Sequence, residues 1–254
     1  MLLNFNTDLC EGYKSPTQKI RVMSEAWITE NAYCVKCGSK LLHFGNNRPV
    51  GDVYCEKCKE EFELKSKKSK IGKKICGSAY SSMISKIESA TIPNFFYLNY
   101  SANDFTVKNL LVIPKHYFTK EIVIERPPLS ANAKRAGWIG CNIDISSIPN
   151  NGKIYLIENG IENNRQDVIK QFNKTLFLRN HNNEIRGWLL DIIKCIELLN
   201  LQEFSLDELY VFEAYLKLKH PKNNNIKPKI RQQVQILRDY GYLVFLGNGK
   251  YKLL

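Results

Sequence analysis

Four cysteines in two pairs limit what this chain can fold into more than any other feature. Cys34 and Cys37 form one C-x2-C pair, and Cys55 and Cys58 form a second pair after 17 intervening residues. Two-residue spacing lets both thiolates of a pair reach one tetrahedral ion at about 2.3 Å, so the pattern predicts a closed, structural Zn²⁺ site. The ion would supply folding free energy to a segment with few apolar residues. Redox-active or simply buried thiols are the alternative interpretation.

The overall charge favours a polyanion as the partner. The chain of 254 residues has 37 lysines and arginines against 25 acidic residues, a formal net charge of +12. Its longest apolar runs are far shorter than the roughly 18 to 20 residues of a membrane span, and its first residues do not resemble a secretory signal. We therefore expect a cytoplasmic protein with no membrane partner. In that reducing compartment the cysteines are better explained as metal ligands or free thiols than as disulfides.

The hydrophobic patterns predict a mixed α/β core followed by a second, smaller domain. Residues 15–27 have the spacing of a helix with one buried face, and the alternation of Phe62 and Leu64 with charged residues is typical of a half-buried strand. Strand patterns stop near residue 180, so we expect two domains, residues 1–182 and 183–254. Further elements are expected as a helix over 78–90 and strands over 94–100, 110–113, 122–124, 154–157 and 176–178.

Asp52, Glu63 and Lys65 are the candidate catalytic residues. Phosphodiester hydrolysis needs an activated water, a cation and positive charge near the transition state. Glu63 and Lys65 would project from the same face of a strand, so that only Leu64 faces the core, while Asp52 would come from a neighbouring strand. The carboxylates of Asp52 and Glu63 suit Mg²⁺, and Lys65 would position or help deprotonate the water. A solvated strand edge explains the same spacing equally well.

At this point the sequence resembles a known family. Gly51-Asp52 followed by Glu63-Leu64-Lys65 resembles the motif of the PD-(D/E)xK nuclease superfamily, with Gly51 in place of the proline in that name. Longer segments across the whole chain resemble the DpnI-type restriction endonucleases. These segments are residues 47–50 (NRPV), 60–68 (EEFELKSKK), 135–144 (RAGWIGCNID) and 229–239 (KIRQQVQILRD).

The resemblance implies both a fold and an activity. The fold class is α/β, a mixed-sheet PD-(D/E)xK nuclease core with an inserted four-cysteine zinc site and a small C-terminal winged-helix domain. The activity is that of a type II, methyl-directed restriction endonuclease of a restriction-modification system, which hydrolyses double-stranded DNA at GATC sites that carry N6-methyladenine. The resemblance assigns catalysis to Asp52, Glu63 and Lys65, with Mg²⁺ as the catalytic ion and Zn²⁺ on the four cysteines. We expect a monomer that uses no small-molecule cofactor.

The C-terminal residues have the signals of a winged helix-turn-helix. Ser205 to Glu208 form a capping box, so a helix should begin at Leu206 and run towards Lys219. Another helix begins near Pro228, and a strand pair over 243–246 and 251–254 would make the wing. The adenine N6 group lies in the major groove, where the last helix normally enters. The candidate DNA contacts there are Asn225, Lys227, Lys229, Arg231 and Gln232, with a solvated polar helix face as the alternative.

Candidate DNA contacts also lie in the first domain. Trp138 is close to Arg135 in a segment of small residues, where an indole could contact a methylated base, although a core tryptophan is the other interpretation. The lysine run is predicted to contact phosphates or to be solvated; it contains Lys67, Lys68, Lys70, Lys73 and Lys74.

Two competing hypotheses stay open from sequence alone. A zinc-ribbon and winged-helix transcription factor would bind DNA without cleaving it, so replacing Asp52 or Lys65 would leave its activity intact. A repair or mobile-element nuclease would keep the same catalytic residues but cleave according to DNA structure rather than adenine methylation.

Overall fold

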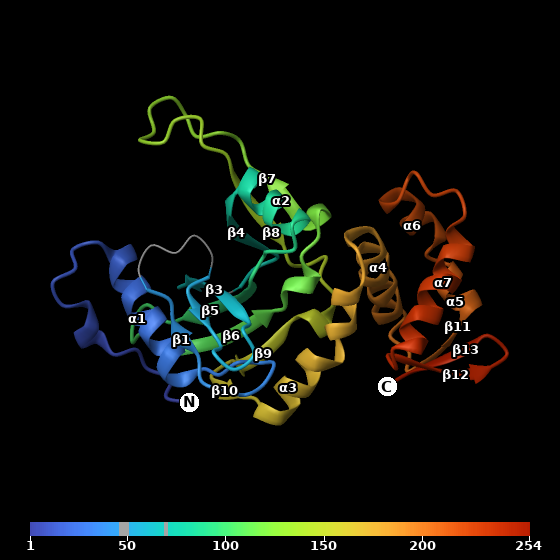
Figure 1. Ribbon diagram of the computed structural model, residues 1–254. Helices are drawn as coiled ribbons and strands as arrows, with labels where there is room; N and C mark the ends of the chain where they lie inside the picture. The colour runs from blue at the N-terminus through green and yellow to red at the C-terminus, as the bar shows by residue number, and fades with distance from the viewer. Residues whose placement is uncertain (46–50, 69–70) are drawn as a thin grey trace. The chain divides into compact units, whose positions relative to one another are not determined.

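The computed structural model describes residues 1–45, 51–68 and 71–254 (Figure 1). The resembling segment 47–50 and Lys70 lie outside these residues. The chain forms two units: residues 1–146 with 151–175, and residues 147–150 with 176–254. Among the described residues, none of the helices combines the length and the apolar character that crossing a bilayer requires.

A seven-stranded mixed sheet forms the core of the first unit. Its strands β3 and β5 are parallel, and every other neighbouring pair is antiparallel. A parallel pair needs a crossover, and the helix α2 (Tyr80–Glu88) lies in the connection between β3 and β5. The strands in spatial order are β1 (Leu42–His43), β2 (Val53–Tyr54), β3 (Glu61–Lys67), β5 (Asn94–Tyr100), β6 (Val107–Ile113), β9 (Ile154–Glu158) and β10 (Ile161–Glu162).

The predicted buried strand at 94–100 and the predicted first helix are confirmed. β5 is buried at all seven of its positions, which explains its run of aromatic and apolar residues. The helix α1 (Pro16–Asn31) continues for one turn beyond the prediction, because Ile28 adds to the buried face made by Met23 and Trp27. The indole of Trp27 also donates a hydrogen bond to the carbonyl of Leu2, at 2.8 Å.

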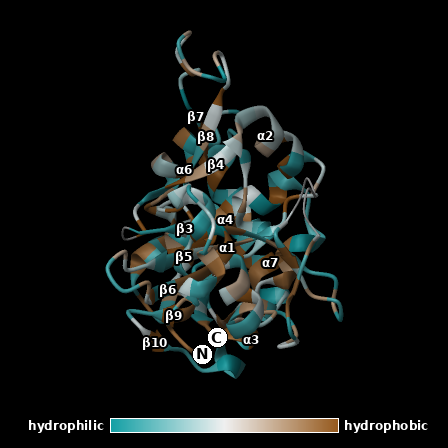
Figure 2. Cartoon of the chain, turned by 90° about the vertical axis from the view of Figure 1, so that its left-hand side faces the viewer, coloured by the Kyte–Doolittle hydropathy of each residue, from teal (hydrophilic) through white to brown (hydrophobic). Residues whose placement is uncertain are grey.

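The sequence predicts only one strand, at 122–124, of a second sheet that has three strands. This sheet consists of β4 (Lys74–Ala79), β8 (Gly140–Asp144) and β7 (Val123–Glu125), in that order. β4 begins inside the lysine run and contains Gly77, where an added Cβ would lie 2.4 Å from the sulfur of Cys141. Lysine and glycine both have a low propensity for strands, so the sequence pattern did not predict β4. The loop between β7 and β8 projects away from the rest of its unit, as the two views agree (Figures 1 and 2).

Two predicted strands differ from the structure. Residues 176–178 lie in a 3-10 helix, η5 (Leu176–Asn180), rather than in a strand. That run is short and begins directly after α3 (Arg165–Lys174), and its residues Phe177 and Leu178 are buried without any strand partner. The strand expected at 122–124 begins one residue later, because Ile122 ends the 3-10 helix η3 (Lys120–Ile122).

The second unit has the winged-helix architecture that the sequence predicts. The capping box is present, with the Ser205 hydroxyl accepting from the Glu208 amide and the Glu208 carboxylate accepting from the Ser205 amide. The predicted helix from Leu206 to Lys219 is in fact interrupted between Tyr210 and Glu213, and the wing has three strands instead of two. The elements are α4 (Asn183–Leu199), β11 (Glu203–Ser205), α5 (Leu206–Tyr210), α6 (Glu213–Lys219), α7 (Ile226–Asp239), β12 (Leu243–Gly247) and β13 (Lys250–Leu253).

Candidate active site and metal centre

Asp52 is held against β3 by backbone hydrogen bonds. Its amide donates to the carbonyl of Phe62 at 2.8 Å, and its carboxylate oxygen Oδ2 accepts from the amide of Leu64 at 2.6 Å. Gly51, which stands where the superfamily name has proline, has a φ of +74°. Proline is restricted to a φ of about −65°, so it could not replace glycine in this backbone conformation. The glycine in place of the motif's proline is therefore explained by the backbone conformation of the residue that precedes Asp52 and β2.

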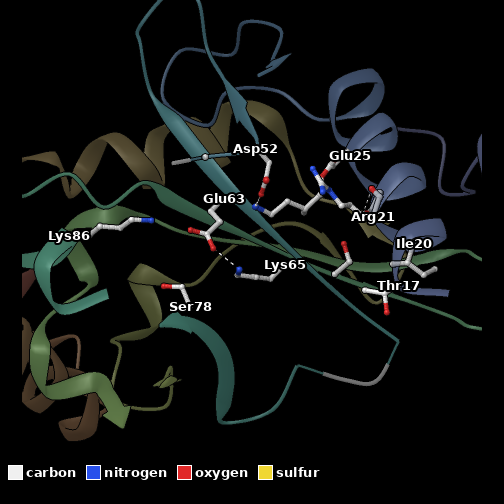
Figure 3. A pocket seen from close by; sticks show the side chains of 13 residues that line it. Thr17, Ile20, Arg21, Glu25, Asp52, Glu63, Lys65, Ser78 and Lys86 are labelled. Atoms are coloured by element: carbon white, nitrogen blue, oxygen red, sulfur yellow. Dashed lines mark hydrogen bonds and ion pairs between the residues drawn. The ribbon is translucent and has the colours of Figure 1, made fainter. Parts of the chain in front are cut away.

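Glu63 and Lys65 extend from one face of β3, as their two-residue spacing predicts. The ammonium of Lys65 lies 2.5 Å from Oε1 of Glu63, and both side chains line one pocket together with Asp52 (Figure 3). Leu64, expected to face the core between them, is less buried than that expectation implies. Leu64 is half-buried and lines the same pocket, whereas the fully buried apolar residue of this strand is Phe62.

The pocket has a volume of about 400 Å³ and contains residues that sequence reasoning missed. Arg21 and Glu25 come from α1 and do not belong to the buried residues of that helix. Glu25 accepts from Nε of Arg21 at 2.7 Å and lies 3.1 Å from Nε2 of His43. Their i, i+4 spacing was visible in the sequence, but that spacing is typical of surface ion pairs as well. Ser78 and Lys86 line the other side of the pocket.

The electrostatics of the pocket favour a bound cation. Burial raises the pKa of the Asp52 carboxyl; the Leu64 amide opposes this shift, and the charges of Glu25 and Glu63 add to it. Arg21 and Lys65 balance the charges of Glu25 and Glu63, so the partly buried Asp52 is the carboxylate whose charge a bound cation would stabilise most. Carboxylate oxygens are the ligands that Mg²⁺ prefers, so Asp52 and Glu63 fit that ion chemically.

Cys34, Cys37, Cys55 and Cys58 come together as the spacing predicts. Their four sulfur atoms lie within 4.8 Å of one another, and within residues 1–45, 51–68 and 71–254 no other group of metal-binding side chains is this close. The Cys34 and Cys58 sulfurs are 3.4 Å apart, and the Cys37 and Cys55 sulfurs are 3.5 Å apart. Four sulfurs bound to one Zn²⁺ would be separated by about 3.8 Å, so the cluster fits a tetrahedral zinc site.

The protein environment already favours the thiolate form at one of these ligands. Burial alone would raise the pKa of the Cys37 thiol, but hydrogen bonds from the side chain and backbone of Ser39 lower that pKa to about 6. Burial raises the pKa of Cys34 and Cys58 instead. A bound metal ion would stabilise the deprotonated form of Cys34 and Cys58 against this effect of burial, because thiolate is the ligand form.

Buried polar contacts connect the cysteine cluster to the central strands. The side chain of Glu60 is only 4% exposed; it accepts from Nζ of Lys36 at 3.1 Å and from the Asn94 amide group at 2.9 Å. Lys36 lies between the first two cysteines, and Asn94 is the first residue of β5. The same cluster is fixed to α3, because Arg165 donates to the Gly38 carbonyl and Asn173 donates to the Lys36 carbonyl.

The predicted groove contacts of the second unit lie on the polar face of α7 and, for Asn225, at its N-cap. Asn225, Lys227, Arg231 and Gln232 are exposed, and Lys229 is half-buried. The opposite face packs into the core with Ile230, Val234 and Leu237 buried. Two of these residues already interact with other side chains of the protein: Lys227 lies 3.6 Å from the Glu213 carboxylate, and Arg231 donates to the Tyr210 hydroxyl.

The predicted contacts of the first unit lie at β3 and at the β7–β8 loop. Lys67 and Lys68 are exposed at the end of β3. Trp138 is half-buried rather than a core residue, and the guanidinium groups of Arg135 and Arg126 lie 4.9 and 5.7 Å from the centre of its ring. Gly140 permits this packing, because an added Cβ would lie 2.7 Å from the indole.

Two family models match the chain. The DpnI model, described as the Dam-replacing family, matches residues 1–181, which include the pocket and the four cysteines. The C-terminal DpnI model, described as the Dam-replacing HTH domain, matches residues 184–253, which include α7 and the wing. These matches confirm the resemblance found in the sequence. Since the first model alone covers most of the chain, the protein belongs to the Dam-replacing family.

Proposed function

We propose that this protein is a Mg²⁺-dependent, methyl-directed restriction endonuclease that cleaves double-stranded DNA at GATC sites containing N6-methyladenine. The observation that carries the proposal is the meeting of Asp52, Glu63 and Lys65 in one pocket, from segments separated by the second cysteine pair. A DNA-binding protein without nuclease activity has no need of such a group. Membership of the Dam-replacing family supports the same activity.

The mechanism assigns a role to each of the three side chains. Asp52 uses Oδ2 to accept from the Leu64 amide, so its other oxygen, together with Glu63, would hold Mg²⁺. When bound, Mg²⁺ supplies Lewis-acid stabilisation of the phosphate and lowers the pKa of a coordinated water. Lys65 is held by Glu63, so its ammonium orients the attacking water and balances the negative charge that develops on the phosphate.

Each domain contributes to DNA recognition in this proposal. We place the catalytic domain at residues 1–182 and the winged-helix domain at 183–254. The exposed polar face of α7 offers glutamine and lysine side chains to the adenine edge in the major groove. Trp138 and Arg135 in the catalytic domain contact the methylated base pair, while Lys67 and Lys68 contact phosphates. The protein acts as a monomer.

Plasmid cleavage tests this function. Plasmid DNA from hosts with and without adenine methylation of GATC is incubated with the protein and Mg²⁺, with an EDTA control. We expect only the methylated plasmid to be cut, and only with Mg²⁺. Equal cutting of both plasmids would remove the methyl requirement and favour a nuclease guided by DNA structure. Binding without cutting would favour the transcription-factor hypothesis.

A further inference from the structure

The catalytic pocket has a second side that the proposed mechanism does not use. The acidic side comes from α1, β3 and the residue before β2, and it carries Glu25, Asp52 and Glu63. The other side comes from β4 and α2, and it carries Ser78 and Lys86. In Figure 3 the ammonium end of Lys86 points into the pocket, towards the side on which Glu63 lies.

Lys86 differs from the other two cations of the pocket. Arg21 is paired with Glu25 at 2.7 Å, and Lys65 is paired with Glu63 at 2.5 Å. Among the residues that the structure describes, Lys86 has no side-chain hydrogen bond or ion pair. Its side chain is half-buried, so part of its hydration has been given up without a protein anion in return.

The hydroxyl of Ser78, like the ammonium of Lys86, has no hydrogen-bond partner among the described residues. The hydroxyl oxygen is buried. A buried hydroxyl without a partner costs free energy, and because Ser78 lines the pocket, an oxygen of a bound ligand is the acceptor that would remove this cost.

The backbone fixes both residues in place. The carbonyl of Lys86 accepts from the amides of Thr91 and Ile92, at 3.0 and 3.2 Å, at the point where α2 ends. The neighbouring Met83 and Ile87 are buried and anchor the helix. Ser78 lies in β4, and its carbonyl accepts from the thiol of Cys141 at 3.3 Å. The two donors are therefore held on rigid elements opposite the carboxylates.

We propose that Lys86 and Ser78 bind the non-bridging oxygens of the scissile phosphate, so that Lys86 acts as a second catalytic cation. This inference rests on the proposed nuclease function. The phosphate then lies between a side that holds the metal ion and a side that donates hydrogen bonds. The negative charge on those oxygens increases in the transition state, so a cation that no carboxylate neutralises lowers the barrier more than it strengthens ground-state binding.

Single-turnover cleavage of a methylated GATC duplex with Mg²⁺ tests the proposal. We expect Lys86→Met to slow cleavage about 100-fold, Ser78→Ala to slow it about tenfold, and Lys86→Arg to recover part of the rate. Duplex affinity measured without Mg²⁺ should change less than about threefold. The control is Lys120→Ala. Lys120 lies outside the pocket and pairs with Glu88, a residue of α2 like Lys86, so this variant should cleave like the unchanged protein. Melting temperatures check that each variant folds.

A duplex with a methylphosphonate at the scissile position sharpens the test. This neutral group lacks one charged oxygen, so the rate difference between Lys86→Met and the unchanged protein should shrink to a few-fold. A difference that stays about 100-fold, or a Lys86→Met variant that cleaves normal DNA at full rate, would overturn the proposal.

A second readout separates this inference from the proposed function. Acetylation of lysines by an amine-reactive reagent is measured by mass spectrometry, with and without the duplex and without Mg²⁺. We expect the duplex to protect Lys86 at least about tenfold more than Lys120. Equal labelling of Lys86 in both conditions would overturn the phosphate contact even if the protein cleaves DNA. A protein that protects Lys86 but cleaves nothing would instead contradict the proposed nuclease function.

Discussion

The cysteine cluster and the carboxylate pocket are both candidate metal sites, but they are built in opposite ways. The four sulfurs lie within 4.8 Å of one another, and Cys34 and Cys55 are completely buried. The carboxylates of Asp52 and Glu63 instead line an open pocket of about 400 Å³. A closed set of soft ligands leaves no position for a substrate, whereas an open set of oxygen ligands leaves room for water and phosphate. We therefore expect the first site to stabilise the fold, and we propose that the second performs the chemistry.

Removing a zinc ligand should have the largest effect and should act on folding. We expect Cys34→Ser to unfold the first unit, because zinc binding contributes roughly 10 kcal/mol or more to the folding of small zinc sites. Thermal unfolding followed by circular dichroism, with zinc content measured in parallel, gives the result. The control is Cys76→Ser at an exposed thiol outside the cluster. A Cys34→Ser protein that stays folded without zinc would contradict the structural role of the cysteine cluster.

Removing a pocket carboxylate should slow cleavage strongly and leave folding intact. We expect Asp52→Asn to slow cleavage roughly 1,000-fold, about 4 kcal/mol in the barrier. A raised pKa in the folded state means that the charged form of Asp52 opposes folding, and that this cost appears as pH rises through the raised pKa. At neutral pH the melting temperature of Asp52→Asn should therefore be unchanged or higher. The matched control is Asp167→Asn, on the exposed side of α3.

Glu60 offers a test of the connection between the cysteine cluster and the central strands. Glu60→Ala should lower the free energy of unfolding by about 3 kcal/mol, because Lys36 and the buried Asn94 lose a shared partner. Denaturant unfolding measures this value, and the rate of zinc transfer to a chelator should rise as well. Exposed Glu56→Ala is the control. If zinc release is unaffected, the cluster and the central strands are independent of each other.

The smallest effect should come from the second unit, which contains neither site. Ser205→Ala removes the helix cap of α5 and should cost about 1 kcal/mol, with no change in zinc content or single-turnover cleavage chemistry. The hydrogen bonds from Ser205 lower the pKa of Glu208, so the stability from this cap is present above the ordinary glutamate pKa and is lost as pH falls through the lowered value. Melting curves between pH 3 and 7 would show whether Ser205→Ala removes that dependence.

The sequence predicts the elements whose signals are local. The cysteine pairs, the buried strand β5 and the capping box at Ser205 each depend on a few neighbouring residues, and each is found in the structure. Strands β4 and β8 of the second sheet were missed because each is held by a partner far along the chain rather than by its own propensity.

The pocket shows the same limit. The face shared by Glu63 and Lys65 follows from strand geometry. Glu25, Ser78 and Lys86 could not be assigned, because only the packing of α1, β4 and α2 around β3 places them there. A single charged residue on a helix has no local pattern that separates a pocket residue from a solvated one.

The contacts of Arg165 and Asn173 with the cysteine cluster have a consequence for biosynthesis. Their partners Gly38 and Lys36 emerge from the ribosome more than 120 residues earlier, with separations of 127 and 137 positions. When only the segment with the four cysteines has been synthesised, it would bind the metal ion before α3 is present to support it. Contacts between residues so far apart in the chain also form slowly. We expect a chain truncated after residue 160 to exchange zinc faster than the full-length protein. Equal exchange rates would show that α3 does not slow the release of zinc from the cysteine cluster.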